Sequence, residues 1–177
     1  MNKRVSRIVV ITLLLILVTV SPLLASKSLA PFWTIGINME EYDESIFAPY
    51  KLTLVNVWAT FCPPCLQEMP ALGELYREYA DQGLGIIGIV TDIFDKDERF
   101  FKANLNTAGF IVEHTKANYP HLLLSDDLYN LRLKNSQVVP ETFFVDSRGN
   151  IVGQTHYGAK TKAAWKKVIE STLKLVE

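Results

Sequence analysis

Both cysteines of the chain lie at the junction between a predicted strand and a predicted helix. The segment 54–70 reads LVNVWATFCPPCLQEMP, and two prolines alone separate Cys62 from Cys65. The run 51–58 is mostly apolar and β-branched, which is typical of a buried strand. Apolar side chains then recur at three- and four-residue spacing over 63–82, which predicts a helix. The two thiols are therefore expected at the start of a helix that directly follows a buried strand.

The two thiols of such a pair have unequal chemistry. As the N-cap of the helix, Cys62 lies beside unpaired backbone N–H groups and the positive end of the helix dipole, which stabilise an anion. Because the thiolate is the form that attacks a disulfide, this position favours Cys62 as the nucleophile. Cys65 lies one turn further on the same face, where it can resolve the mixed disulfide that Cys62 forms. Pro63 and Pro64 lack an N–H, so we expect the backbone N–H of Cys65 to donate to the Cys62 sulfur.

Three other uses of a close cysteine pair fit the sequence less well. A structural disulfide across two residues closes almost no loop and so contributes little stability. A zinc site needs four ligands, and none of the three histidines has ligand spacing to the pair: His114, His121 and His156. Two thiolates can bind copper(I), so metal transport remains an alternative. The favoured interpretation is thiol-disulfide exchange.

The remaining pattern predicts an α/β domain with a central mixed sheet, because buried strands alternate with helices and a hairpin follows. The segment 110–124 has only weak hydrophobic periodicity, and we expect it either to contact a partner or to form a surface loop. The expected strands are 84–91, 121–125, 141–146 and 151–158, the last two forming a hairpin around SRGN, and the expected helices are 95–109, 126–134 and 161–176.

The N-terminus has the pattern of an export signal. Three basic residues (Lys3, Arg4 and Arg7) precede the apolar run 8–20, which predicts a cytoplasmic N-terminus and a domain outside the membrane. We therefore divide the chain into 1–30, an uncleaved membrane anchor or a cleaved signal peptide with a short linker, and 31–177, the folded domain. Of the 18 basic residues, 14 lie beyond residue 30 against 19 acids, a formal charge of −5. Without a basic stripe, nucleic acid is excluded as a partner.

The motifs around the cysteines resemble those of the thioredoxin superfamily, in its TlpA/ResA/DsbE(CcmG)-like group of membrane-anchored thiol-disulfide oxidoreductases. NVWATFCPPC is close to that group's NFWATWCxPC, and VVPETFFVDSRGNIV is close to its xxPxTFxIDxxGxI. Pro70, five residues after Cys65, is similar to the helix-kinking proline of thioredoxins. The resemblance covers most of 32–177 and implies a thioredoxin-like fold, a central mixed sheet flanked by helices after an N-terminal signal or anchor helix.

The resemblance also implies a substrate-binding surface. It places Val139 and Pro140 against the Cys62 sulfur, with a cis peptide bond before the proline that leaves the Val139 backbone free to pair with an extended substrate. Phe61 takes the place of a tryptophan common in relatives, and we expect it at the partner surface. Trp58 is expected either there or in the core.

Two carboxylates are candidate active-site groups. Asn56 departs from thioredoxin itself, which has a buried aspartate at the matching strand position, so Cys65 needs another base. Glu68 lies three residues after Cys65 and resembles the active-site glutamate of the ResA-like group. Glu141, directly after Pro140, is a second candidate that could help select partners.

These features predict an extracytoplasmic protein-disulfide reductase, a monomer that needs no dissociable cofactor or metal. The family resemblance implies recharging of the redox-active Cys62–Cys65 pair by a CcdA/DsbD-like membrane electron donor. It also implies exported client proteins with disulfides, such as apocytochrome c. A disulfide-forming oxidase of the same fold is the alternative, because the sequence does not set the reduction potential, and a copper-binding assembly factor is the second alternative.

Overall fold

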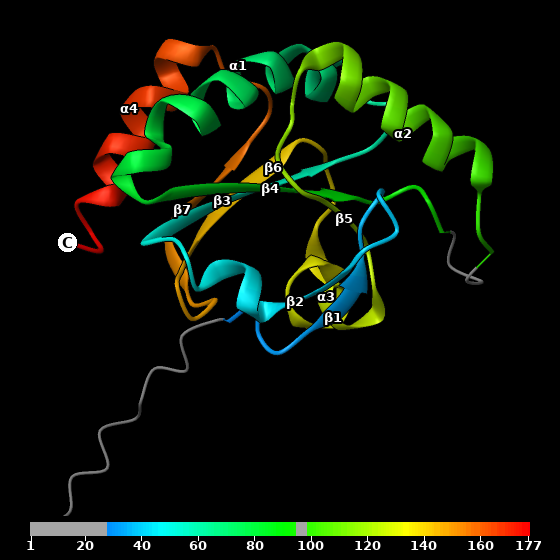
Figure 1. The fold of residues 1–177 in the computed structure, drawn as a ribbon, viewed down its shortest axis with the longest axis horizontal. Coiled ribbons are helices and arrows are strands. Elements are labelled where there is room, and N and C mark those ends of the chain that lie inside the picture. Colours follow the sequence, from blue (N-terminus) through cyan, green and yellow to red (C-terminus); the bar gives the residue numbers. More distant parts are fainter. Residues whose placement is uncertain (1–27, 95–98) are drawn as a thin grey trace, which may run out of the picture.

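A five-stranded mixed sheet organises the computed structural model, which describes residues 28–94 and 99–177. The strand order is β5-β4-β3-β6-β7 (Figure 1). β3, β4 and β5 are parallel neighbours, whereas β6 is antiparallel to both β3 and β7. The strands are β3 (Leu52–Trp58), β4 (Leu84–Val90), β5 (His121–Leu123), β6 (Glu141–Asp146) and β7 (Ile151–Tyr157). The predicted mixed sheet and its C-terminal hairpin are confirmed.

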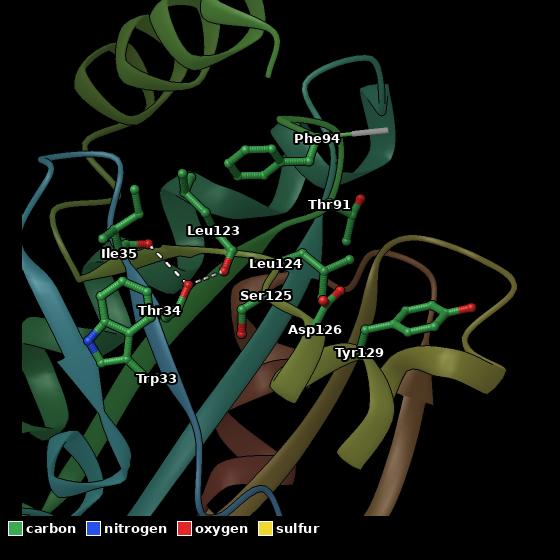
Figure 2. Close-up of a pocket in the computed structure, with 10 residues that line it drawn as sticks. All are labelled: Trp33, Thr34, Ile35, Thr91, Phe94, Leu123, Leu124, Ser125, Asp126 and Tyr129. Atoms are coloured by element: carbon green, nitrogen blue, oxygen red, sulfur yellow. Dashed lines mark hydrogen bonds between the residues drawn. The ribbon is translucent and has the colours of Figure 1, made fainter. Parts of the chain in front are cut away.

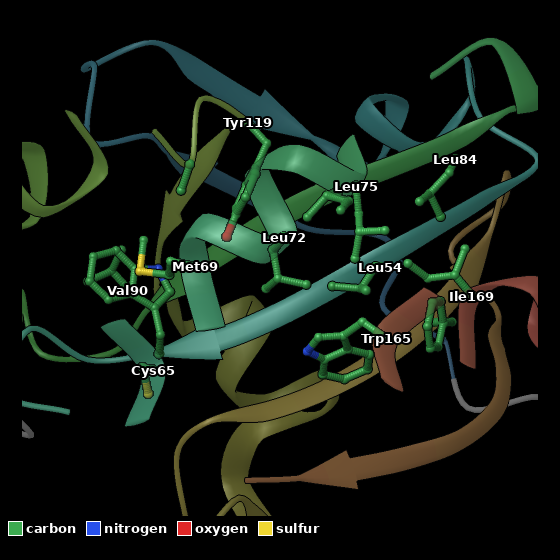
Figure 3. Packing of buried hydrophobic residues seen from close by; sticks show 14 of the residues in the cluster. Leu54, Cys65, Met69, Leu72, Leu75, Leu84, Val90, Tyr119, Trp165 and Ile169 are labelled. Carbon is green, nitrogen blue, oxygen red and sulfur yellow. The ribbon is translucent and has the colours of Figure 1, made fainter. Parts of the chain in front are cut away.

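Both faces of the sheet are covered. Successive side chains of a strand point to opposite faces, so Leu54 joins one apolar cluster and Val55 the other. Three helices cover the first face: α1 (Pro63–Tyr79), α2 (Lys102–Thr115) and α4 (Lys162–Leu173). On the second face lie β1 (Trp33–Ile35), β2 (Glu41–Asp43), η1 (Glu44–Phe47) and α3 (Asp126–Leu131). Figure 3 shows part of the first cluster, to which Cys65, Met69, Leu72 and Trp165 all belong.

The helix that carries the cysteines begins and ends where the sequence predicts. Pro63 opens α1, because its missing N–H is one that the first turn leaves unpaired anyway. A short 3-10 turn (Ala80–Gln82) continues the helix, and Gly83 ends it with a φ of 84°, a left-handed conformation that suits glycine.

The second helix differs from its prediction. The sequence predicted a helix over 95–109 that ends at Gly109, whereas α2 runs from Lys102 to Thr115. An ideal Cβ at Gly109 would meet nothing within 4 Å, so this glycine lies on an open face and does not interrupt the helix. α2 continues because Ile111 in the next turn is buried, and it ends at Lys116 in the left-handed region, with a φ of 56°. Much of the weakly patterned segment 110–124 is therefore helix and strand.

The start of the folded part lies slightly before the predicted boundary. Leu29, which we assigned to the linker, is fully buried, and its backbone N–H donates to the Gly149 carbonyl at 2.8 Å. The predicted membrane anchor, 8–25, lies outside the described residues. Within 28–94 and 99–177, no helix is both long and apolar enough to cross a bilayer.

Candidate active site

The two cysteines form a disulfide at the N-terminus of α1. Cys62 is the N-cap, and its sulfur accepts a hydrogen bond from the backbone N–H of Cys65 at 3.2 Å, as predicted. Cys62 retains 4% of its surface, whereas Cys65 retains none. Cys62 is therefore the more accessible residue of the pair, which fits an attacking first thiol and a resolving second one.

Glu68 lies one helical turn after Cys65 and is buried, with 1% of its surface exposed. One oxygen accepts from Asn56 Nδ2 at 3.0 Å. The other accepts from the indole Nε1 of Trp165 at 3.0 Å and from the Lys160 backbone N–H at 3.1 Å. Burial raises the pKa of the Glu68 carboxyl above its ordinary value, and the three hydrogen bonds oppose that rise. The chain thus holds a buried carboxyl one helical turn after the resolving cysteine, and proton exchange between the two stays a prediction.

Asn56 connects this carboxyl to the neighbouring strand. Its Nδ2 also donates to Thr142 Oγ1 of β6 at 3.1 Å, two residues after Pro140. Its Oδ1 is buried and has no hydrogen-bond partner among the described residues. The Asn56 amide on β3 therefore bridges Glu68 and the segment that contains Pro140.

The Val139–Pro140 peptide bond is cis, as the family resemblance implied. Pro140 is buried, and its carbonyl accepts from the Gly158 N–H at 2.9 Å. Val139 is half-buried and packs against the apolar cluster that contains both cysteines. The described structure thus places Val139 against the cluster to which the redox pair belongs; its contact with the Cys62 sulfur and substrate pairing by its backbone stay predictions.

Glu141 has a partner on its own chain. It is fully buried, and its carboxylate accepts from Arg132 Nη2 at 2.5 Å and from the hydroxyl of Ser136. Arg132 also donates to Thr155 Oγ1 of β7 at 3.0 Å. This network ties the segment after α3 to the terminal hairpin, and a direct contact of Glu141 with a partner protein stays a prediction.

The two aromatic residues before Cys62 lie in different environments. Phe61 is 74% exposed beside the disulfide, on a surface that a partner can reach. Trp58 is fully buried, and its indole N–H donates to Nδ1 of His121 at 3.1 Å. His121 Nε2 therefore carries the proton and donates to the Ala117 carbonyl at 2.9 Å. The core alternative for Trp58 is the one that the structure shows.

Several residues that shape the site were not predicted. Asp92 accepts from the backbone N–H of Thr60 at 3.1 Å and from its hydroxyl at 2.5 Å, which fixes the loop before Cys62. Its place directly after a parallel strand was a usable signal, because such strand ends meet at one edge of a sheet. Trp165 and Lys160 contact Glu68 across more than ninety positions of sequence, and no local pattern reveals them.

Comparison with known sequences agrees with this geometry. The model of the AhpC/TSA family matches residues 36–154. The thiol:disulfide interchange protein DsbE of Pasteurella multocida is 34% identical over 140 residues, which cover 78% of this chain and 68% of the relative. The thiol-disulfide oxidoreductase ResA of Halalkalibacterium halodurans is 27% identical over 127 residues, which cover 72% of this chain. The match spans 63% of that relative, less than two thirds of its length.

Comparison with solved structures supports the fold. A thioredoxin-family thiol:disulfide interchange protein from Chlorobium tepidum superposes with a TM-score of 0.66 at 20% identity, over 81% of this chain and 94% of that one. The likeness includes the mixed sheet and its flanking helices, and the fold is thioredoxin-like. With the family model matched over residues 36–154, the chain belongs to the AhpC/TSA family of thioredoxin-like proteins.

Proposed function

We propose that this chain is an extracytoplasmic thiol-disulfide oxidoreductase that reduces disulfides in exported proteins. The observation that carries the proposal is the Cys62–Cys65 disulfide at a helix N-terminus, in which only Cys62 retains exposed surface, with a buried Glu68 in the next turn of the helix. The names of the DsbE and ResA relatives support the same reaction class.

The proposed reaction transfers two electrons from the protein to its client. The reduced Cys62 thiolate attacks one sulfur of the client disulfide, and the other client sulfur leaves as a thiolate that takes up a proton. The Cys65 thiol then loses its proton to Glu68 and attacks the Cys62 sulfur, which releases the second client sulfur as a thiolate. The proton on Glu68 passes to that thiolate, directly or through solvent. The client gains two electrons and two protons, and the protein is left with the Cys62–Cys65 disulfide.

The physiological partners follow from the export signal and the family resemblance. We propose a CcdA/DsbD-like membrane protein as the electron donor that restores the dithiol. We propose apocytochrome c, or another exported protein with oxidised thiols, as the client. The segment 1–30 would keep the domain at the outer face of the cytoplasmic membrane.

The reduction potential tests the proposed direction. The purified chain is equilibrated in thiol/disulfide buffers of graded potential, with Cys62→Ser as the control that cannot form the disulfide. A reductant is expected near the value of thioredoxin, about −270 mV. A value near about −120 mV, that of a strong oxidant, would reverse the assignment to disulfide formation.

A further inference from the structure

A pocket of about 740 Å³ opens between β1, the ends of β4 and β5, and the start of α3. Figure 2 shows the apolar side chains of Trp33, Phe94 and Leu124 and the ring of Tyr129 around it. Trp33 is 54% exposed and Tyr129 is 42% exposed, so both rings remain open to a ligand. The volume is in the range of pockets that bind ligands larger than one amino-acid side chain.

The pocket is connected to the active-site loop through the strands. β3, β4 and β5 are parallel neighbours, so their carboxyl ends lie along one edge of the sheet. Thr91, which lines the pocket, donates its N–H and its hydroxyl to the carbonyl of Trp58, at 3.0 and 3.2 Å. Cys62 follows Trp58 by four residues. Adjacent strands lie about 4.8 Å apart, so the end of β5, which lines the pocket, is about 10 Å from the end of β3, which leads to Cys62.

The rim of the pocket is acidic. Asp126 lines it and is exposed, and the neighbouring Asp127 accepts the backbone N–H of Trp33 at 3.1 Å. No basic side chain is among the residues that line it in the described part of the chain. An apolar pocket with an acidic rim is complementary to a large apolar side chain that has a cationic neighbour.

We propose that this pocket binds the client polypeptide itself: it receives a large apolar side chain three to five residues from the client cysteine, and Asp126 favours a Lys or Arg beside that side chain. An extended chain advances about 3.3–3.6 Å per residue, so three to five residues span about 10–18 Å, enough to cross the separation of about 10 Å between the ends of β3 and β5. The proposal rests on the proposed function, and it adds a sequence preference to an exchange reaction that needs only a disulfide.

A peptide scan tests the position. Peptides with one cysteine, held as a mixed disulfide with thionitrobenzoate in a Gly/Ser/Ala background, carry one Leu at each position up to six residues on either side. Attack by Cys62 of the reduced full chain releases the coloured thiol, which gives the rate constant. We expect the Leu peptide to react about tenfold faster than the Ala peptide at positions three to five on one side. A Lys beside that Leu should raise the rate, a Glu should lower it, and salt should reduce the difference.

Matched variants test the location. Tyr129→Ala should reduce the Leu/Ala rate ratio several-fold, whereas Phe110→Ala, at an exposed aromatic on α2, should keep it. Asp126→Asn should reduce the Lys/Glu ratio, and Asp81→Asn, an exposed acid before β4, should keep it. Phe110 is 60% exposed, and Asp81 and Asp126 are both exposed, so these variants should fold. If Tyr129→Ala does not fold, Asp126→Asn still decides the location, because a Lys/Glu ratio that this variant leaves unchanged would place the preference outside the pocket.

Two outcomes would overturn the proposal: equal rates at all scanned positions, or a Leu/Ala ratio that Tyr129→Ala leaves unchanged. Absence of thiol release from every peptide, the Ala peptide included, is a different result. It would refute the proposed exchange function and, with it, the client contact.

Discussion

At the residue scale, we expect proton transfer at the resolving step to depend on Glu68. Its carboxyl is buried beside α4 and has three hydrogen-bond donors, so its protonation state is set by the fold. We expect Glu68→Gln to slow the resolving step, the release of client thiol by Cys65, by about a hundredfold, because an amide accepts no proton. The attack by Cys62 should change little. Stopped-flow measurement of the two steps separates these effects.

The pH dependence supplies the control for this prediction. In the unaltered chain the resolving rate should rise as Glu68 loses its proton, at a pH above the ordinary Glu range because burial raises its pKa. Trp165→Phe removes a hydrogen-bond donor that lowers the pKa of Glu68. The pKa should then be higher still, and the resolving rate should increase at a correspondingly higher pH. Glu74→Gln, at an exposed acid of the same helix, should leave the profile unchanged. A Glu68→Gln resolving rate equal to that of the unaltered chain at each pH would exclude Glu68 as the base.

The sequence was informative at this scale only where function depends on local spacing. Cys62, Cys65 and Glu68 lie within seven positions on one helix, and helical periodicity places them together. The hydrogen bonds from Lys160 and Trp165 to Glu68 depend on how α4 packs on α1, which no local pattern specifies. The buried contacts of Glu141 depend in the same way on α3 and β7.

At the scale of elements, the same substitution should have opposite effects in β4 and α2. An ideal Cβ at Gly88 would lie 2.2 Å from His121 Nδ1 and 3.0 Å from Trp58 Nε1, inside the hydrogen-bonded pair. Gly88→Ala should therefore lower the free energy of unfolding by about 1–3 kcal/mol. At Gly109 a Cβ meets nothing within 4 Å, so Gly109→Ala should raise it by about 0.5–1 kcal/mol. Urea unfolding of both oxidised variants measures the difference.

Equal effects of the two substitutions would contradict this account of the glycines. The pair also illustrates which elements the sequence could predict. β3, β4, α1 and the terminal hairpin have clear periodicity or turn residues, and their predictions hold. Gly109 was interpreted as a helix end because glycine has low helix propensity, yet burial of Ile111 in the next turn outweighs that cost. β1 and β2 have three residues each, too few for a periodic signal.

At the scale of the whole molecule, the carboxyl ends of the parallel strands position both candidate sites. The disulfide follows β3, and the proposed client pocket lies beyond β4 and β5. The alternating strand and helix pattern predicted the sheet, and hence this edge. The pocket was not predictable, because β1 and α3, which close it, are more than 90 residues apart in sequence and meet only through tertiary packing.

Two buried groups make the stability of the whole molecule depend on pH, with opposite signs. Burial lowers the pKa of His121 from 6.5 to about 4, so its contribution is present above pH 6.5 and is lost as the pH falls through about 4. This shift corresponds to about 3 kcal/mol. Burial raises the pKa of Glu68, so its contribution is present below about pH 4.5 and is lost as the pH rises through the raised pKa.

We therefore expect the free energy of unfolding to increase from pH 4 to pH 6.5, with His121 as the larger influence and Glu68 reducing the slope. Urea unfolding of the oxidised chain at half-unit pH intervals measures it. His121→Gln keeps an acceptor for Trp58 and takes up no proton, so it should flatten the increase. Glu68→Gln should steepen the curve above pH 4.5, because it removes the opposing group. A profile that is flat in the unaltered chain and the same in His121→Gln would show that His121 is not held neutral by the fold.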